Sequence, residues 1–180
     1  MKALIVIDVQ HGLFRSSPAP ASAESVIHRI NGLTRRARLQ GAPVIFVQHE
    51  ATGGEYFRHG SAEWALDAGL VTCDTDQLVR KTTPDSFLRT DLEAVLAKCG
   101  ASHLVVCGYA SEFCIDTTVR RAAALGYEVT LVSDAHTTQD KAHADAAHII
   151  AHHNATLPSI RSFGVPIHAQ ASEGVEFAQG

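Results

Sequence analysis

Three reactive side chains each come at or just after a short apolar run in this sequence. Asp8 follows the run IVI, Lys81 follows LVR, and Cys114 comes a few residues after LVV. A thiol, a carboxylate and an ammonium together supply the nucleophile, the proton acceptor and the cation that acyl transfer requires. Because an ionisable group at the end of a buried strand is costly unless it is paired, we predict that folding gathers these three around one cavity.

Each of these residues also has a plainer interpretation when it is taken alone. Asp8 can cap nearby backbone amides, Lys81 can be a solvated strand end, and a lone Cys is usually a small buried apolar residue. Cys114 differs because it opens a predicted helix and is expected to lie near an ammonium. Both features lower the pKa of a thiol, so we expect Cys114 to be an activated nucleophile.

Short β-branched runs alternate with stretches of helical periodicity along the whole chain. The predicted strands are 3–9, 43–48, 77–80, 103–107, 127–133 and 163–168, and the predicted helices are 22–40, 90–100, 112–125 and 139–156. This alternation is typical of a three-layer α/β/α sandwich with a Rossmann-like, largely parallel six-stranded sheet. Ligands of such folds bind beyond the carboxyl ends of the strands, which is where the three reactive residues are predicted to lie.

Length and composition favour one globular domain over residues 1–180. Lys plus Arg number 15 and Asp plus Glu 19, a net charge of −4 that argues against nucleic acid as a partner. No apolar run approaches the ~20 residues that span a membrane, and the N-terminus makes a poor signal peptide. The four Cys include no CxxC pair, so we expect a cytoplasmic protein without a disulfide framework.

Residues 108–118 (GYASEFCIDTT) carry a resemblance to a known family. This stretch, with Gly126-Tyr127 and Asp134-Ala135 downstream, resembles the isochorismatase-like cysteine hydrolase superfamily. The motif 7–10 (IDVQ) and Lys81 with 85–87 behind it fit the same pattern, in the same order. The resemblance extends from Ala3 to about Thr138, nearly the whole chain, and identifies the superfamily more specifically than the substrate.

The resemblance implies a catalytic triad of Asp8, Lys81 and Cys114. In that family the thiolate attacks a carbonyl carbon, the Asp moves the proton to the leaving amine, and water hydrolyses the thioester. The resemblance also implies an oxyanion hole made by the backbone N–H groups of Ala110 and Cys114. A cis peptide bond between Tyr109 and Ala110 is implied as well. These features predict hydrolysis of a small amide at its C–N bond.

The sequence departs from the metal-dependent members of that family. Nicotinamidase-like members carry an Asp-x-His pair after the second strand and bind a divalent metal, whereas residues 48–51 here are QHEA. We therefore expect no metal and no cofactor, and nicotinamide is a less favoured substrate. His148 and His152 lie four residues apart on a predicted helix, but a solvated or subunit-facing surface explains them better than a metal site.

Three other functions stay open from the sequence. Isochorismatase proper cleaves a vinyl ether without needing a thiol, so the presence of Cys114 favours amide hydrolysis over that reaction. A nicotinamidase-like amidase is the second alternative. A binding scaffold that keeps the triad without using it is the third. The family resemblance also predicts a homo-oligomer, either a dimer or a tetramer.

The long connection 49–76 is the expected source of substrate contacts, because loops of this length in compact domains are usually functional or disordered. His49 and Trp64 in this loop are candidates for walls of the pocket. Gln10 and Gln48 follow or close predicted strands beside it and are further candidates for binding substrate. The alternative for all four is that they hold the loop against the body of the protein.

Overall fold

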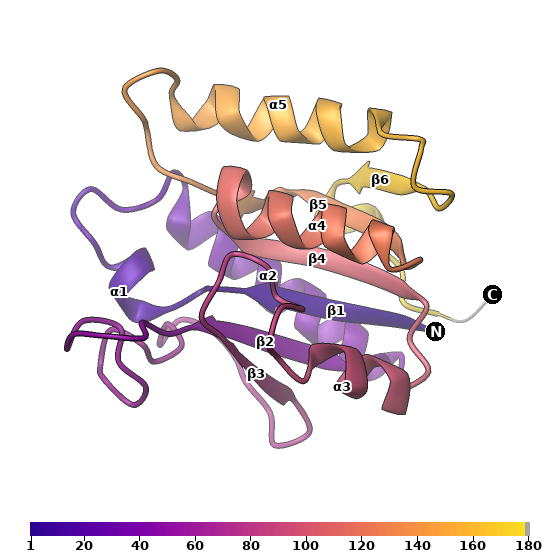
Figure 1. The fold of residues 1–180 in the computed structure, drawn as a ribbon, viewed down its shortest axis with the longest axis horizontal. Coiled ribbons are helices and arrows are strands. Elements are labelled where there is room, and N and C mark those ends of the chain that lie inside the picture. The colour runs from indigo at the N-terminus through magenta and orange to yellow at the C-terminus, as the bar shows by residue number, and fades with distance from the viewer. Residues whose placement is uncertain (179–180) are drawn as a thin grey trace.

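A computed structural model, which describes residues 1–178, contains one sheet of six parallel strands (Figure 1). The strands are β1 (Lys2–Ile7), β2 (Val44–His49), β3 (Gln77–Lys81), β4 (His103–Tyr109), β5 (Glu128–Thr137) and β6 (Ile167–Gln170). Their spatial order is β3-β2-β1-β4-β5-β6, so β1 lies in the interior of the sheet. β2 and β3 are added on one side of β1, and β4, β5 and β6 are added on the other side. The carboxyl ends of β1 and β4 meet at this switch in strand order.

Helices cover both faces of the sheet. The α-helices are α1 (His11–Phe14), α2 (Ala23–Leu39), α3 (Leu92–Lys98), α4 (Asp116–Ala124) and α5 (Ala146–Ser159), with a π-helix η1 (Ser111–Ile115) and a 3₁₀-helix η2 (Ser172–Gly174). One core contains buried side chains of α3, α4 and α5, and a second core on the other face contains those of α1 and α2. The predicted three-layer α/β/α sandwich with a six-stranded sheet is confirmed.

The central strand β1 explains why both layers form. Its side chains alternate between the two cores: Ile5 and Ile7 pack with α4 residues, while Leu4 and Val6 pack with α2 residues. All four are at most 1% exposed, as expected for a parallel strand with helices on both faces. Among the described residues, no helix is both long enough and apolar enough to cross a lipid bilayer.

Three predicted elements differ from the structure by three or more residues at one end or both. β5 extends to Thr137 instead of ending at 133, because Ala135 to Thr137 remain buried against the core. The last helix begins at Ala146 instead of 139, and the Asp145 side chain caps it by accepting the backbone N–H of His148 at 2.8 Å. The sixth strand is Ile167–Gln170 instead of 163–168. The sixth strand lies where its residues pair with Val129 to Val132 of β5, a contact that the local sequence pattern does not show.

Gly108 lies opposite Ile7, the last residue of β1. Its φ is +121°, and a Cβ atom built on it would lie 2.0 Å from the backbone oxygen of Ile7. Ile7 and Gly108 are also register partners in the sheet. No side chain other than hydrogen fits between these two strands, so glycine here allows the strand before Asp8 and the strand before Cys114 to pair closely.

Replacing Gly108 tests the importance of this approach. We expect Gly108→Ala to lower the free energy of unfolding by at least about 4 kcal/mol, because the new methyl group overlaps backbone rather than a flexible side chain. Gly126→Ala is the matched control, since Gly126 also has positive φ (+92°) but open space around it, and should cost only about 1–2 kcal/mol. Urea denaturation of both variants measures the difference, and equal losses would contradict the steric argument.

Candidate active site

Asp8, Lys81 and Cys114 meet at the carboxyl end of the sheet. The ammonium of Lys81 donates to Oδ2 of Asp8 at 2.7 Å and to Sγ of Cys114 at 3.3 Å. The Lys81 and Asp8 side chains are 0% and 2% exposed. The structure therefore brings the three residues of the sequence prediction together from β3, from the end of β1 and from the segment after β4.

The backbone at Asp8 directs its carboxylate into this cluster. Asp8 follows the last residue of β1 and has a φ of +53°, in the left-handed region that Asp tolerates better than most residues. Its backbone N–H donates to the Val47 carbonyl at 2.9 Å, which ties the turn to β2. Oδ1 of Asp8 is buried and has no hydrogen-bond partner among the described residues, so one carboxylate oxygen is available to accept a proton.

Cys114 lies in the π-helix η1, an element that the sequence did not predict. The Ala110 carbonyl accepts the N–H groups of Phe113 and Ile115, each at 3.1 Å, and the intervening N–H of Cys114 takes part in neither bond. The peptide bond between Tyr109 and Ala110 is cis. π-Helical turns occur often at functional sites, and this one presents the thiol at the start of α4.

The thiol of Cys114 is not activated in the way that the sequence suggested. Burial and the nearby Asp8 carboxylate raise its pKa to about 12, and the opposing effect of the Lys81 ammonium is smaller. The prediction of a lowered pKa was wrong, because the thiol is partly buried beside the fully buried Asp8 carboxylate, where a thiolate is unfavourable. Burial lowers the pKa of Lys81, but Asp8 and Cys114 outweigh burial and raise it overall, so the ammonium stays charged.

His49 is the sequence-predicted binding residue that lies in the cluster. Its Nδ1 is 3.5 Å from Nζ of Lys81, and it lines the same cavity as the thiol. Burial is the main cause of a lowered pKa for His49, and the positive charge of Lys81 lowers it further. The imidazole is therefore neutral near pH 7.

Gln10, Gln48 and Trp64 have other partners. The Gln10 amide donates to the carbonyls of His49 (2.9 Å) and Trp64 (2.7 Å) and accepts the His49 N–H (2.9 Å). Gln48 also donates to the Trp64 carbonyl, at 3.0 Å. None of the three side chains lines the cavity, and both Gln residues hold the 49–76 loop in place, so direct substrate contact by them stays a prediction.

A cavity of about 400 Å³ opens over Cys114. It is lined by Asp8, Leu13, His49, Tyr56, Phe57, Pro84, Tyr109, Ala110, Phe113 and Cys114. Sequence analysis did not assign Leu13 or Phe113 to the site. Phe113 directly precedes the thiol in the 108–118 motif, a signal that could have identified it. Leu13 carries no such signal, since only folding brings α1 to this edge of the sheet.

A buried polar chain holds the segment before Cys114. Nδ1 of His136 is 2.8 Å from Oγ of Ser111, and Nε2 of His136 is 2.9 Å from Oδ1 of Asn154. Asn154 in turn donates to the Ser133 carbonyl at 2.9 Å. These bonds connect η1 to β5 and α5. Burial lowers the pKa of His136 to about 4, so the ring is neutral near pH 7.

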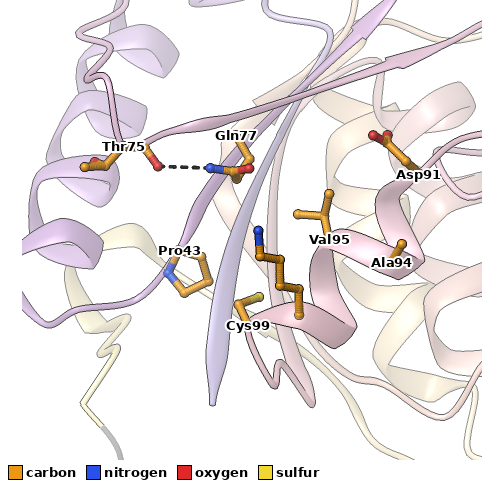
Figure 2. Close-up of a pocket in the computed structure, with 8 residues that line it drawn as sticks. Pro43, Thr75, Gln77, Asp91, Ala94, Val95 and Cys99 are labelled. Carbon is orange, nitrogen blue, oxygen red and sulfur yellow. Dashed lines mark hydrogen bonds between the residues drawn. The ribbon is translucent and has the colours of Figure 1, made fainter.

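A second cavity, of about 420 Å³, lies at the opposite end of the strands (Figure 2). Thr75 and Gln77 at the start of β3 face Asp91, Val95 and Cys99 of the α3 region across it. It contains none of the residues that the sequence singled out for chemistry. In residues 1–178, no three His, Cys, Asp or Glu side chains are grouped so that they could hold a metal ion.

The family of the chain follows from comparison with known proteins. The family model described as the isochorismatase domain matches residues 2–162. The chain belongs to the isochorismatase family. The superfamily resemblance inferred from the motif around Cys114 is therefore confirmed.

Three relatives illustrate the range of this isochorismatase domain. Streptothricin hydrolase from Streptomyces noursei is 37% identical over 140 residues, which cover 78% of this chain and 51% of that protein. Nicotinamidase 3 from Arabidopsis thaliana is 30% identical over 151 residues, 76% of this chain and 73% of that protein. A crystal structure of an isochorismatase family protein superimposes with a TM-score of 0.86 at 33% identity and covers 94% of this chain and 98% of that chain. The chain spans only about half the length of the streptothricin hydrolases that it matches.

The raised pKa of Cys114 predicts slow alkylation of the resting thiol. We expect reaction with iodoacetamide to accelerate about tenfold per pH unit from pH 7 to pH 10, because only the thiolate reacts and the pKa lies near 12. Cys73 serves as an internal comparison: it is exposed, and hydrogen bonds from Thr75 lower its pKa, so it should react first. Peptide mass spectrometry follows both sites, and a Cys114 rate that levels off below pH 9 would contradict this account.

The lowered pKa of His136 predicts a loss of stability in acid. The unfolded chain binds this proton with a pKa near 6.5 and the folded chain only near 4. Neutral His136 therefore makes its full contribution to the free energy of unfolding above about pH 6.5. This contribution is lost as the pH falls to 4, and the loss is about 3 kcal/mol in total.

The measurement for His136 is the free energy of unfolding against pH. His136→Gln is the suitable comparison, because its amide can accept from Ser111 and donate to Asn154 without titrating. The wild type should lose more stability than this variant between pH 6.5 and pH 4. Parallel pH profiles for the two proteins would show that His136 does not titrate on unfolding.

Proposed function

We propose that the protein hydrolyses a small carboxamide through a thioester on Cys114. The observation that carries this proposal is the contact of Lys81 with both Asp8 (2.7 Å) and Cys114 (3.3 Å) beneath a cavity large enough for a small substrate. A nucleophile, a proton acceptor and a fixed cation then lie together, which is the set required for covalent acyl transfer.

The first step of the proposed reaction joins proton transfer to attack. Because the thiol of Cys114 is protonated at rest, its proton moves to the free Oδ1 of Asp8 while Sγ forms a bond to the amide carbon. Lys81 keeps its hydrogen bond to Oδ2, which orients the carboxylate, and its charge stabilises the developing thiolate. The buried cluster thus holds the nucleophile neutral until a carbonyl carbon is in place.

The negative charge that develops on the substrate oxygen needs donors. The backbone N–H groups of Ala110 and Cys114 are the proposed pair, and both residues line the cavity. The Ala110 carbonyl accepts two other N–H groups, which holds the peptide that follows Ala110 at the start of η1. A single donor of this kind is typically worth about 3–4 kcal/mol in the transition state.

Breakdown of the tetrahedral intermediate returns the enzyme to its starting state in two stages. Asp8 gives its proton to the leaving nitrogen as the C–N bond breaks, and an amine or ammonia departs. Water then attacks the thioester, its proton passes through Asp8 to Sγ of Cys114, and a carboxylic acid is released. Protons and electrons balance with water as the only co-reactant.

The names of relatives support amide hydrolysis over ether hydrolysis. Nicotinamidase 3 is an amidase by name, and a ureidoacrylate amidohydrolase from Caulobacter segnis is 28% identical over 171 residues. Streptothricin hydrolase is named for a different substrate from these two relatives, so membership of the family does not define the substrate of the present chain. A cytoplasmic homo-oligomer stays a prediction.

Turnover of a panel of small carboxamides tests this function. We expect Cys114→Ala to lower kcat by at least about 10³-fold and Asp8→Asn to lower it by about 10²–10⁴-fold, since the latter keeps the shape but cannot accept a proton. Cys73→Ser, which changes an exposed thiol outside the cavity, should leave turnover unchanged. Intact-protein mass spectrometry should show the acyl adduct on wild type alone. Turnover by Cys114→Ala equal to wild type would exclude covalent catalysis.

A further inference from the structure

We propose that the acyl part of the substrate is apolar and carries no carboxylate, so that anionic amides are excluded from the site. This inference rests on the proposed amide hydrolysis and names its substrate class. Two observations support it. The walls of the cavity are mainly apolar or aromatic, and the Lys and Arg side chains near it already form ion pairs with Asp or Glu.

The walls of the cavity favour an apolar acyl group. Six of its ten lining residues are Leu13, Tyr56, Phe57, Pro84, Tyr109 and Phe113. The remaining four belong to the reactive cluster or to the backbone next to it, namely Asp8, His49, Ala110 and Cys114. Aromatic walls of this kind bury flat or aliphatic groups well and offer a carboxylate no compensation for lost water.

Lys81 cannot act as the partner of a substrate carboxylate. An ammonium has three N–H donors, and those of Lys81 face Asp8 at 2.7 Å, Cys114 at 3.3 Å and His49 at 3.5 Å. Its side chain is fully buried and does not line the cavity. A carboxylate in the cavity would instead meet the negative charge of Asp8 beyond the thiol.

The other nearby cations are also paired. Lys141 lies 5.5 Å from the centre of the Phe113 ring, but its ammonium is 3.4 Å from the carboxylate of Glu112. Arg80, next to Lys81 on β3, makes two bonds to Glu50, at 2.7 and 3.0 Å. Neither residue lines the cavity, and in residues 1–178 no Arg or Lys does. His49 is neutral near pH 7, so it adds no positive charge.

A pair of amides that differ by one carboxylate tests the inference. Benzamide and 4-carbamoylbenzoate have the same ring and the same reacting group, and only the second carries a distal anion. We expect kcat/KM by ammonia release to be at least about 100-fold higher for benzamide, because a buried carboxylate without a partner is strongly disfavoured. In parallel, NMR titration of the Cys114→Ala variant measures the binding of both compounds without turnover, and benzamide should bind more tightly.

Phe113 offers a designed reversal of this preference. The residue is 54% exposed and lines the cavity, so a replacement there need not disturb the core. We expect Phe113→Arg to improve kcat/KM and binding for 4-carbamoylbenzoate at least about tenfold. Phe113→Gln, which is polar but uncharged, should not. The contrast separates the effect of charge from the effect of losing the ring.

The outcomes distinguish the inference from the proposed function. Tighter binding of benzamide to Cys114→Ala supports the substrate class, whether or not wild type hydrolyses either amide. Failure of wild type to hydrolyse both amides would count against the proposed amide hydrolysis and not against the substrate class. Equal or tighter binding of 4-carbamoylbenzoate overturns the substrate class, as does its efficient hydrolysis by wild type. Absence of binding by both compounds also overturns it, because an apolar acyl site should hold benzamide.

Discussion

The buried ion pair of Lys81 and Asp8 is the interaction on which the site depends. Taking two charges out of water is unfavourable unless each finds close partners, and here the ammonium meets a carboxylate, a thiol and an imidazole. Removing any one partner would leave a buried charge less well compensated. The pair therefore links the carboxyl ends of β1 and β3, and the same ammonium contacts His49 at the end of β2 and Cys114 in η1.

Close packing of the strands makes this pair possible. β1 and β4 approach so closely at Ile7 and Gly108 that only glycine fits, and the residues that follow these two strands supply Asp8 and the Cys114 segment. β3 delivers Lys81 from the edge of the sheet, opposite His49 in the register with β2. The all-parallel order brings all these ends to one edge, so residues distant in the chain form a single cluster.

Burial sets the chemistry of the cluster as much as residue type does. The Cys114 thiol is held protonated by loss of water and by the Asp8 carboxylate, even though an ammonium lies 3.3 Å away. This arrangement requires a base within the site, and it makes the free oxygen of Asp8 central to the proposed reaction. In our proposal the cavity prefers uncharged acyl groups, since its walls are mainly apolar or aromatic and, in residues 1–178, no Arg or Lys side chain lines them.

The sequence alone determined the fold class, the family and the cluster of Asp8, Lys81 and Cys114. It did so because apolar runs and the 108–118 motif are local patterns that can be recognised without the tertiary structure. It predicted the wrong direction for the Cys114 pKa, since a position near a helix start is readable from the sequence whereas the extent of burial, the largest cause of the raised pKa, is not. It also offered Gln10 and Gln48 as substrate contacts, although their amides satisfy loop backbone. Only the tertiary structure decided the walls of the cavity, including Leu13, and the Ser111–His136–Asn154 chain, because these contacts join segments that no sequence spacing relates.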